Sequence, residues 1–177
     1  MTDLIVALDD PDLDSSERLA ASLGGVVAGL KVGLTLFARH GPEALFRIGR
    51  HGPVFCDLKL HDIPQQVSRA AGELAARGAW IVTVHASGGA EMVGAAVDGA
   101  RQENPATVIA AVTVLTSLDV NALATVGQGE SLPEQAERLA RLALRAGAGG
   151  LVCSGAEAAR LKALGGEEVM VIVPGVR

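Results

Sequence analysis

Aromatic residues and positive charge are both scarce in this sequence. Its 177 residues include 3 Phe, 1 Trp and no Tyr, and 15 Lys and Arg stand against 20 Asp and Glu. The net charge is −5 and the pI about 5.3. Proteins that bind nucleic acids or anionic membranes generally carry an excess of basic residues, and single strands are bound by stacking bases on aromatic rings. We therefore expect neither nucleic acid nor a membrane as a partner.

Long hydrophobic runs and a cysteine framework are also missing. About the longest apolar run is Val108–Leu115, well short of the roughly 18 residues that a membrane span needs. The N-terminus is acidic and has no features of a signal peptide. Cys56 and Cys153 lie far apart, each in an apolar stretch. We expect reduced core thiols rather than a disulfide or a metal pair, in a cytoplasmic protein.

Seven short runs rich in β-branched residues recur along the chain, each bounded by Gly, Pro or Asp. They are nearly continuous in apolar residues, which is typical of strands covered on both faces. With 49% hydrophobic residues, the chain has enough apolar material for a substantial core. The runs are Leu4–Leu8, Val26–Val32, Val54–Leu58, Ile81–His85, Val108–Leu115, Gly150–Cys153 and Val169–Val173.

Helix signals lie between these runs. Capping patterns, in which a polar residue is followed three positions later by Glu, begin at Asp14, Ser131 and Ser154. Pro64 suits the first turn of another helix, and a turn of helix is expected near residues 121–126. Glycines follow the helical segments where C-caps are expected, at Gly78, Gly147 and Gly165. The repeating unit is therefore a strand followed by a helix.

Such units predict parallel strands, either in a (β/α)₈ TIM barrel or in a doubly wound sheet. A doubly wound sheet that binds nucleotides has a glycine fingerprint after its first strand, and no G-x-G-x-x-G occurs here. We therefore predict the barrel. A barrel usually needs about 200 residues or more. We expect residues 1–177 to form a single barrel domain that ends after the seventh strand, with one strand and its helix missing.

Charged and polar residues stand at the carboxyl ends of the predicted strands. In a barrel of this kind the reactive residues lie at those ends. Core strands normally end in apolar or turn residues, so the charges need an explanation. The residues at these ends are Asp9, Lys31, Asp57, Lys59, Asp62, His85, Thr116 and Arg177.

The alternation along the third strand orders these charges. A period of two places Asp57 and Lys59 on the same side, and the apolar residues at 56, 58 and 60 on the side that faces the helices. Together with Lys31 and Asp62, they form a set of alternating sign. This set is either a salt-bridge network that closes the top of the barrel or a reactive site, and the residues alone leave both interpretations open.

The carboxylates near Lys59 indicate which chemistry a lysine there would perform. A Schiff-base lysine must reach its neutral form, whereas carboxylates two and three positions away stabilise the ammonium form. Lys59 is therefore predicted to be a general acid and a charge clamp. His85 is equally compatible with a packed strand end and with a site residue. The other histidines show no ligand spacing, so no transition-metal site is expected.

Six segments, in order along essentially the whole chain, resemble orotidine 5′-phosphate decarboxylase of the bacterial type. The most specific is the D-x-K-x-x-D-I-P run at 57–64. The resemblance implies decarboxylation of orotidine 5′-phosphate to UMP, the last step of de novo pyrimidine synthesis, without metal or organic cofactor, in a homodimer with shared active sites. The segments are Ile5–Asp9, Leu30–Gly33, Phe55–Pro64, Thr83–Ala86, Val112–Ser117 and Val173–Arg177.

The resemblance also implies a role for each matching residue. Lys59 would protonate C6 as the carboxylate leaves, Asp57 would lie against that carboxylate, and Lys31 would hold Asp57 and the ribose in register. Asp62 would act in the active site of the partner subunit. Further substrate contacts would come from Asp9 at a ribose hydroxyl, Ile63 and Pro64 beside Asp62, Thr116 at the end of the fifth strand, Pro174 at the base and Arg177 toward the phosphate.

Two alternatives remain open. A Mg²⁺-dependent sugar-phosphate decarboxylase or synthase of the same superfamily shares D-x-K-x-x-D, but resembles this chain less because Lys31 stands where an acidic residue is expected. Family members also continue past Pro174-Gly175-Val176-Arg177 with an eighth strand and a Gly-Arg pair that binds phosphate. The second alternative is therefore a non-catalytic remnant that binds a nucleotide weakly or only dimerises.

Overall fold

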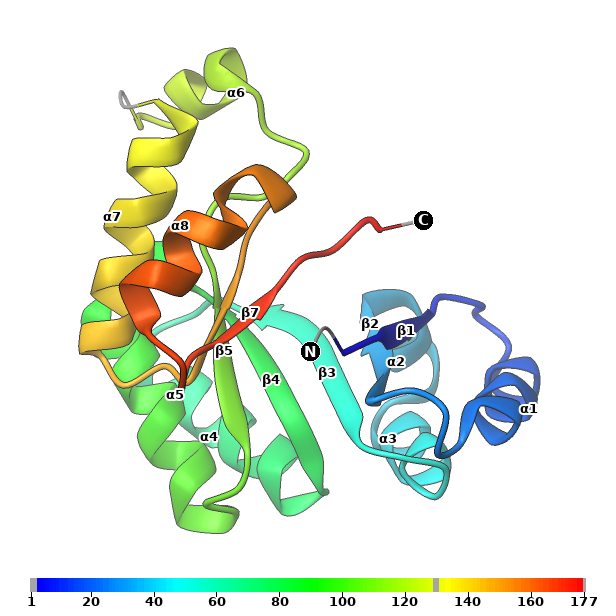
Figure 1. Cartoon of the computed structure of the whole chain (residues 1–177). Coiled ribbons are helices and arrows are strands. Elements are labelled where there is room, and N and C mark those ends of the chain that lie inside the picture. The colour runs from blue at the N-terminus through cyan, green and yellow to red at the C-terminus, as the bar shows by residue number, and fades with distance from the viewer. Residues whose placement is uncertain (1–2, 129–130, 177) are drawn as a thin grey trace.

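Seven parallel strands form one sheet in the order of the sequence, from β1 to β7 (Figure 1). The structure is a computed structural model and describes residues 3–128 and 131–176. Each strand pairs with its neighbours in sequence, so the strand order has no switch point, which excludes the doubly wound sheet. The strands are β1 (Ile5–Leu8), β2 (Gly29–Gly33), β3 (Val54–Leu60), β4 (Ala79–His85), β5 (Val108–Val112), β6 (Gly150–Val152) and β7 (Met170–Ile172).

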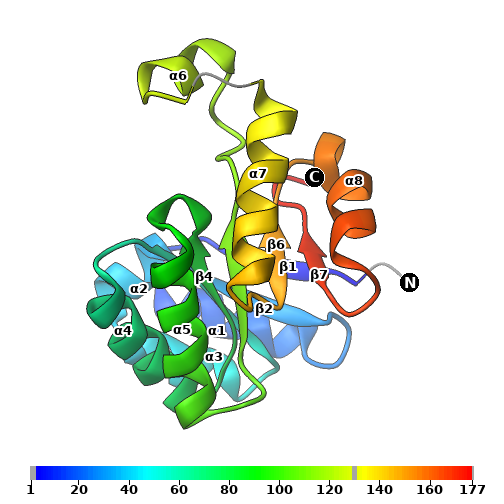
Figure 2. The ribbon, with the colours of Figure 1, turned by 90° about the vertical axis from the view of Figure 1, so that its left-hand side faces the viewer.

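Helices connect the strands and lie outside the curved sheet (Figures 1 and 2). All seven predicted strands are present, with boundaries that shift by a few residues. The helices are α1 (Leu13–Leu23), α2 (Leu34–His40), α3 (Pro42–Gly49), α4 (Pro64–Ala76), α5 (Ala90–Glu103), α6 (Val120–Thr125), α7 (Leu132–Arg145) and α8 (Gly155–Gly165), with a 3₁₀ turn, η1, at Ala86–Gly88. This is the strand-then-helix repeat of a barrel.

Helix capping differs from the prediction at the start of α1. Its N-cap is Asp12 rather than Asp14, and Asp12 Oδ2 accepts from the amide of Ser15 at 3.1 Å. The capping box at Ser154 is complete. Ser131 is the N-cap of α7, but its hydroxyl donates to Glu134 instead of accepting from the backbone. The capping residues therefore mark where helices begin to within two positions.

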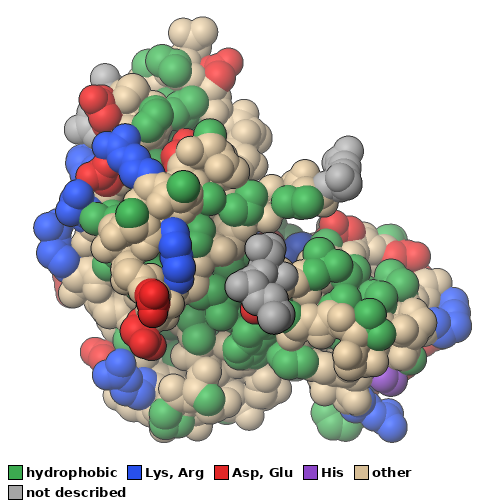
Figure 3. Space-filling view, viewed as in Figure 1, with side chains coloured by type: hydrophobic (Ala, Val, Ile, Leu, Met, Phe, Trp, Pro, Cys, Tyr) green, Lys and Arg blue, Asp and Glu red, His purple; other side chains and the backbone are tan. Residues whose placement is uncertain are grey.

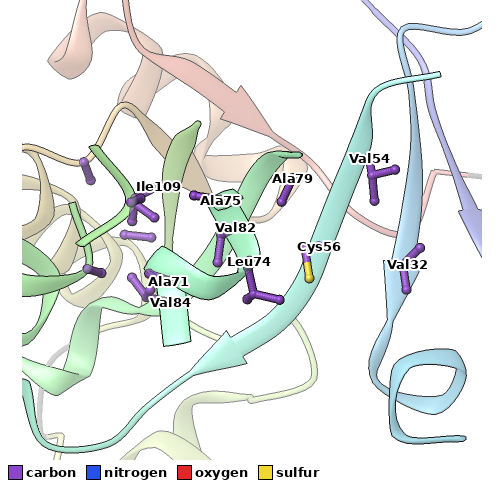
Figure 4. Close-up of a cluster of buried hydrophobic side chains, with 14 of the residues drawn as sticks. Val32, Val54, Cys56, Ala71, Leu74, Ala75, Ala79, Val82, Val84 and Ile109 are labelled. Carbon is purple, nitrogen blue, oxygen red and sulfur yellow. The ribbon is translucent and has the colours of Figure 1, made fainter. Parts of the chain in front are cut away.

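Alternate residues of the strands enter two separate hydrophobic clusters, one on each face of the sheet. Val82 and Val84 belong to the larger cluster, which the helices cover, whereas Ile81 belongs to the smaller cluster with Phe55. Figure 4 shows the larger cluster, with Cys56 of β3 among its members. Hydrophobic side chains also gather in the middle of the face shown in Figure 3. Both faces of the strands are thus covered, as the apolar runs predict.

The two cysteines, Cys56 and Cys153, are free and fully buried, in agreement with core thiols. Burial raises the pKa of the Cys56 thiol to about 12 and that of Cys153 to about 11. Across residues 3–128 and 131–176, no helix is long and apolar enough to cross a membrane.

Candidate active site

Three neighbouring strands carry the charged residues that the sequence singles out. Asp9 directly follows β1, Lys31 lies within β2, and Asp57 and Lys59 lie in the second half of β3. The register pairs Gly33 with Asp57, so the last residue of β2 and the first charged residue of β3 stand at the same height. Parallel strands therefore bring these side chains to one edge of the sheet.

The four side chains form a continuous chain of alternating charge. Lys31 Nζ lies 3.2 Å from Asp9 Oδ1 and 3.7 Å from Asp57 Oδ2. Lys59 Nζ donates to Asp57 Oδ1 at 2.8 Å. The Asp57 side chain is only 15% exposed, whereas that of Asp9 is 73% exposed. Because each inner charge has an opposite charge beside it, the partly buried set is electrostatically compensated.

Lys59 has an unusual backbone. Its φ is +51°, in the left-handed region, and among the described residues no other non-glycine residue has a positive φ. Its amide donates to Thr83 Oγ1 at 2.8 Å, and the Thr83 hydroxyl donates to Asp57 Oδ1 at 3.1 Å. The sequence reasoning missed Thr83, because a threonine inside an apolar strand is ordinarily a β-former. Its signals in the sequence are a polar residue within an apolar run and its place in the resembling segment Thr83–Ala86.

The other predicted site residues lie outside this chain of contacts. Asp62 and Ile63 are exposed in the connection from β3 to α4, and Asp62 Oδ1 accepts from the Ile63 amide at 2.6 Å. Pro64 begins α4. Thr116 is exposed after β5, and Pro174 is exposed after β7. All lie beyond the carboxyl end of their strands, on the same side as the charges, and Arg177 falls outside the described residues.

A histidine pair lies next to the charges. The rings of His85, at the end of β4, and His61 are 5.4 Å apart between centroids. The pKa of His85 is lowered, chiefly by burial and further by His61 and Lys59. The imidazolium form of His85 is therefore disfavoured beside the charged set.

No three His, Cys, Asp or Glu residues lie close enough together to hold a metal ion, as far as the described part of the chain extends. The carboxylates of Asp9 and Asp57 are each engaged by Lys31. An ammonium between two carboxylates occupies the place that a divalent cation would take. The arrangement suits chemistry in which negative charge develops beside a fixed cation.

Known proteins match this chain along almost its full length. The profile of the orotidine 5′-phosphate decarboxylase / HUMPS family matches residues 2–177. The curated orotidine 5′-phosphate decarboxylase of Anaeromyxobacter sp. (strain K) is 51% identical over 175 residues, which are 98% of this chain and 76% of that protein. The chain belongs to the orotidine 5′-phosphate decarboxylase family. A further family member, from Thermobifida fusca, is 49% identical over 176 residues, which are 98% of this chain and 74% of that one.

Solved structures of the family agree with the fold. The crystal structure of orotidine 5′-phosphate decarboxylase from Lactobacillus acidophilus superposes with a TM-score of 0.91 at 34% identity, and the match covers 100% of this chain and 82% of that chain. The seven strands thus have the TIM-barrel arrangement of the decarboxylase family. This chain is shorter than the family members it matches, spanning about three quarters of the curated sequences.

Proposed function

We propose that Lys59 is the proton donor with which this carbon–carbon lyase decarboxylates orotidine 5′-phosphate to UMP. The observation that carries the mechanism is the 2.8 Å contact between Lys59 Nζ and Asp57 Oδ1, within four charges of alternating sign. The identity of 51% to a curated decarboxylase supports the reaction. The runner-up, a Mg²⁺-dependent enzyme of the same superfamily, is disfavoured by Lys31 between the two carboxylates.

The proposed step needs only groups of the protein and the substrate. The bond between C6 and the carboxylate carbon breaks, CO₂ leaves, and the electron pair stays on C6. The ammonium of Lys59 then donates a proton to C6, which gives UMP and a neutral amine that regains its proton from water. No oxidant, metal or organic cofactor is required for this balance.

Electrostatics explains why the charges stand in this order. The substrate carboxylate would lie against Asp57, which repels it in the ground state, and this repulsion disappears when neutral CO₂ departs. C6 gains negative charge as CO₂ departs, and Lys59 stabilises this charge more strongly in the transition state than in the ground state. Lys31 keeps Asp57 in place by contacting its second oxygen.

Six further residues are proposed to contact the substrate: Asp9, Ile63, Pro64, Thr116, Pro174 and Arg177. Asp9 is suited to a ribose hydroxyl because its carboxylate is largely exposed at the edge of the charged set, beside Lys31. Thr116 and Pro174 follow β5 and β7 on the same side of the sheet. Their exposure leaves them available to a ligand.

The decisive experiment follows the ultraviolet absorbance change of orotidine 5′-phosphate in the presence of a chelator. We expect decay with the parent chain and a loss of turnover of at least about 10³-fold in Lys59→Ala. Lys162→Ala is the matched control, because Lys162 lies on α8 and its Nζ donates to the carbonyl oxygens of Glu167 and Val169. Both variants must unfold cooperatively. Parental turnover in Lys59→Ala would contradict the role of Lys59. Decay that occurs without the chelator and not with it would favour the Mg²⁺-dependent alternative.

We also propose a homodimer in which Asp62 completes the partner's active site. Support comes from the position of Asp62 and Ile63 on the surface between β3 and α4, where the Ile63 side chain is 61% exposed. Asp62 is exposed there as well, so its carboxylate is accessible to a second subunit.

Mixing two inactive variants tests the shared site. In a hybrid dimer of Lys59→Ala and Asp62→Asn subunits, one site carries both defects and the other carries none. We expect activity to reappear on refolding the mixture. Two independent sites would leave every site with one defect, and the mixture would stay as inactive as its components.

A further inference from the structure

Strand β3 departs from regular pairing at the residues that carry the site. Cys56 pairs with Val82 of β4, and the next paired residue of β3, Leu60, faces Val84. Three residues of β3, from 57 to 59, therefore stand opposite Thr83 alone. Such a bulge redirects side chains and leaves backbone groups without their ladder partners.

Thr83 provides the hydrogen-bond acceptor that the Lys59 amide does not find in the pairing of β3 with β4. Its side chain is fully buried, and its Oγ1 accepts from the Lys59 amide at 2.8 Å. An amide can only donate and an ionised carboxylate can only accept, so the single hydroxyl proton must be directed to Asp57 Oδ1, 3.1 Å away. Both bonds of this hydroxyl thus have a fixed direction.

The same carboxylate oxygen receives the Lys59 ammonium. Lys59 is bonded through its amide to Thr83 and through its Nζ to Asp57 Oδ1. Thr83 is bonded to that same oxygen. Three groups therefore form a closed set of contacts around the left-handed backbone of Lys59, whose φ of +51° is disfavoured for any residue with a Cβ atom.

We propose that Thr83 is a positioning residue, whose hydroxyl holds the bulged backbone of Lys59 and the carboxylate of Asp57 so that the ammonium faces C6 of the substrate. This inference rests on the proposed function for its catalytic consequence. Because Thr83 is fully buried, it would act through the two charged residues that it contacts and not by touching the ribose or the phosphate. Its loss is therefore expected in kcat and hardly in KM.

The test compares a replacement that removes the hydroxyl with one that removes only the methyl group. Thr83→Val keeps the shape and loses both hydrogen bonds, whereas Thr83→Ser keeps the hydroxyl. We expect kcat to fall about 10- to 100-fold in Thr83→Val, KM to stay within about threefold, and Thr83→Ser to return kcat to within about fivefold of the parent. Thr107→Val is the control, because Thr107 Oγ1 donates to the Ala79 carbonyl at the opposite end of the sheet, at 2.6 Å.

A second readout does not depend on turnover. The Lys59 amide is bonded to Thr83 Oγ1, so its hydrogen exchange in the native state reports that bond. We expect exchange at Lys59 to be at least about tenfold faster in Thr83→Val than in the parent and in Thr107→Val.

The outcomes separate this proposal from the function on which it rests. A parent that does not decarboxylate overturns the proposed function, and unchanged exchange at Lys59 in Thr83→Val overturns the positioning itself. Parental kcat in Thr83→Val, or equal losses in the Val and Ser variants, overturns the role of the hydroxyl while the function stands. A drop confined to KM also overturns it.

Discussion

Lys31 Nζ lies 3.7 Å from Oδ2 of Asp57, while Lys59 Nζ and the Thr83 hydroxyl both contact Oδ1. The Asp57 carboxylate thus holds two ammonium groups, one through each oxygen. With Asp9 on the far side of Lys31, the four charges sum to zero. Removing the charge of Asp57 leaves an excess positive charge in a partly buried place, without removing the shape of the side chain.

Asp57→Asn tests that arrangement. We expect the variant to fold and turnover to drop at least about 100-fold, because the amide cannot hold both ammonium groups in register. The affinity for orotidine 5′-phosphate should rise relative to the affinity for UMP, since only the substrate has a carboxylate for Asp57 to repel. Turnover by absorbance and binding by calorimetry measure the two effects. Asp98→Asn, on the exposed face of α5, is the matched control, and an unchanged ratio of the two affinities would contradict the proposed repulsion.

The backbone of Lys59 gives a prediction about stability alone. At φ +51° a Cβ atom is strained and glycine is not. We expect Lys59→Gly to be more stable than Lys59→Ala by roughly 1 kcal/mol. At Lys162, inside helix α8, the order should be reversed, with glycine about 1 kcal/mol less stable than alanine. Denaturant unfolding of the four variants measures both differences, and the same order at both positions would show that residue 59 is not strained.

The apolar runs predict the seven strands, and the structure brings together four of the charges that the sequence singles out, for physical reasons. Strands buried on both faces must be apolar throughout, so β4 and β5 were visible as runs. Charges at the end of such a run are too costly to occur without partners, which identified Asp57 and Lys59. Both inferences depend on local composition alone.

The remaining features depend on contacts that local patterns do not encode. Helices α2 and α3 begin after Gly33 and Gly41, without a side-chain cap. No start signal marks α2, and the only one at α3 is Pro42 in its first turn. The bulge in β3 is set by its register with β4, and a period of two cannot reveal it. Thr83 was missed for that reason. Its importance arises only when three residues of the neighbouring strand face it.

The two thiols are predicted to be unreactive in the folded protein. Burial raises the pKa of Cys56 to about 12 and the pKa of Cys153 to about 11. At pH 8 each thiol is therefore ionised in only about one molecule in 10³ to 10⁴. We expect a disulfide reagent to modify neither thiol within an hour in the native state. Both should react promptly in guanidinium chloride. Single replacements, Cys56→Ser and Cys153→Ser, assign any thiol that reacts, and prompt native reaction at either would contradict its burial.

The lowered pKa of His85 predicts how the free energy of unfolding depends on pH. Its pKa in the folded protein lies below the ordinary value of 6.5, because burial and the nearby His61 and Lys59 disfavour the imidazolium. Below pH 6.5 the unfolded chain therefore binds a proton that the folded chain does not, and the free energy of unfolding falls as the pH falls. The slope from this one group cannot exceed about 1.4 kcal/mol per pH unit.

His85→Gln isolates that contribution. Between pH 8 and 5 the free energy of unfolding of the variant should decline less than that of the parent, and the two curves should run parallel above pH 7. The carboxylate of Glu17 has a lowered pKa through its hydrogen bond to Arg47, so its contribution is lost only below its ordinary value of 4.5, outside this range. Guanidinium titrations at half-unit steps give both curves. Parallel curves down to pH 5 would mean that His85 accepts a proton as readily in the folded barrel as in the unfolded chain.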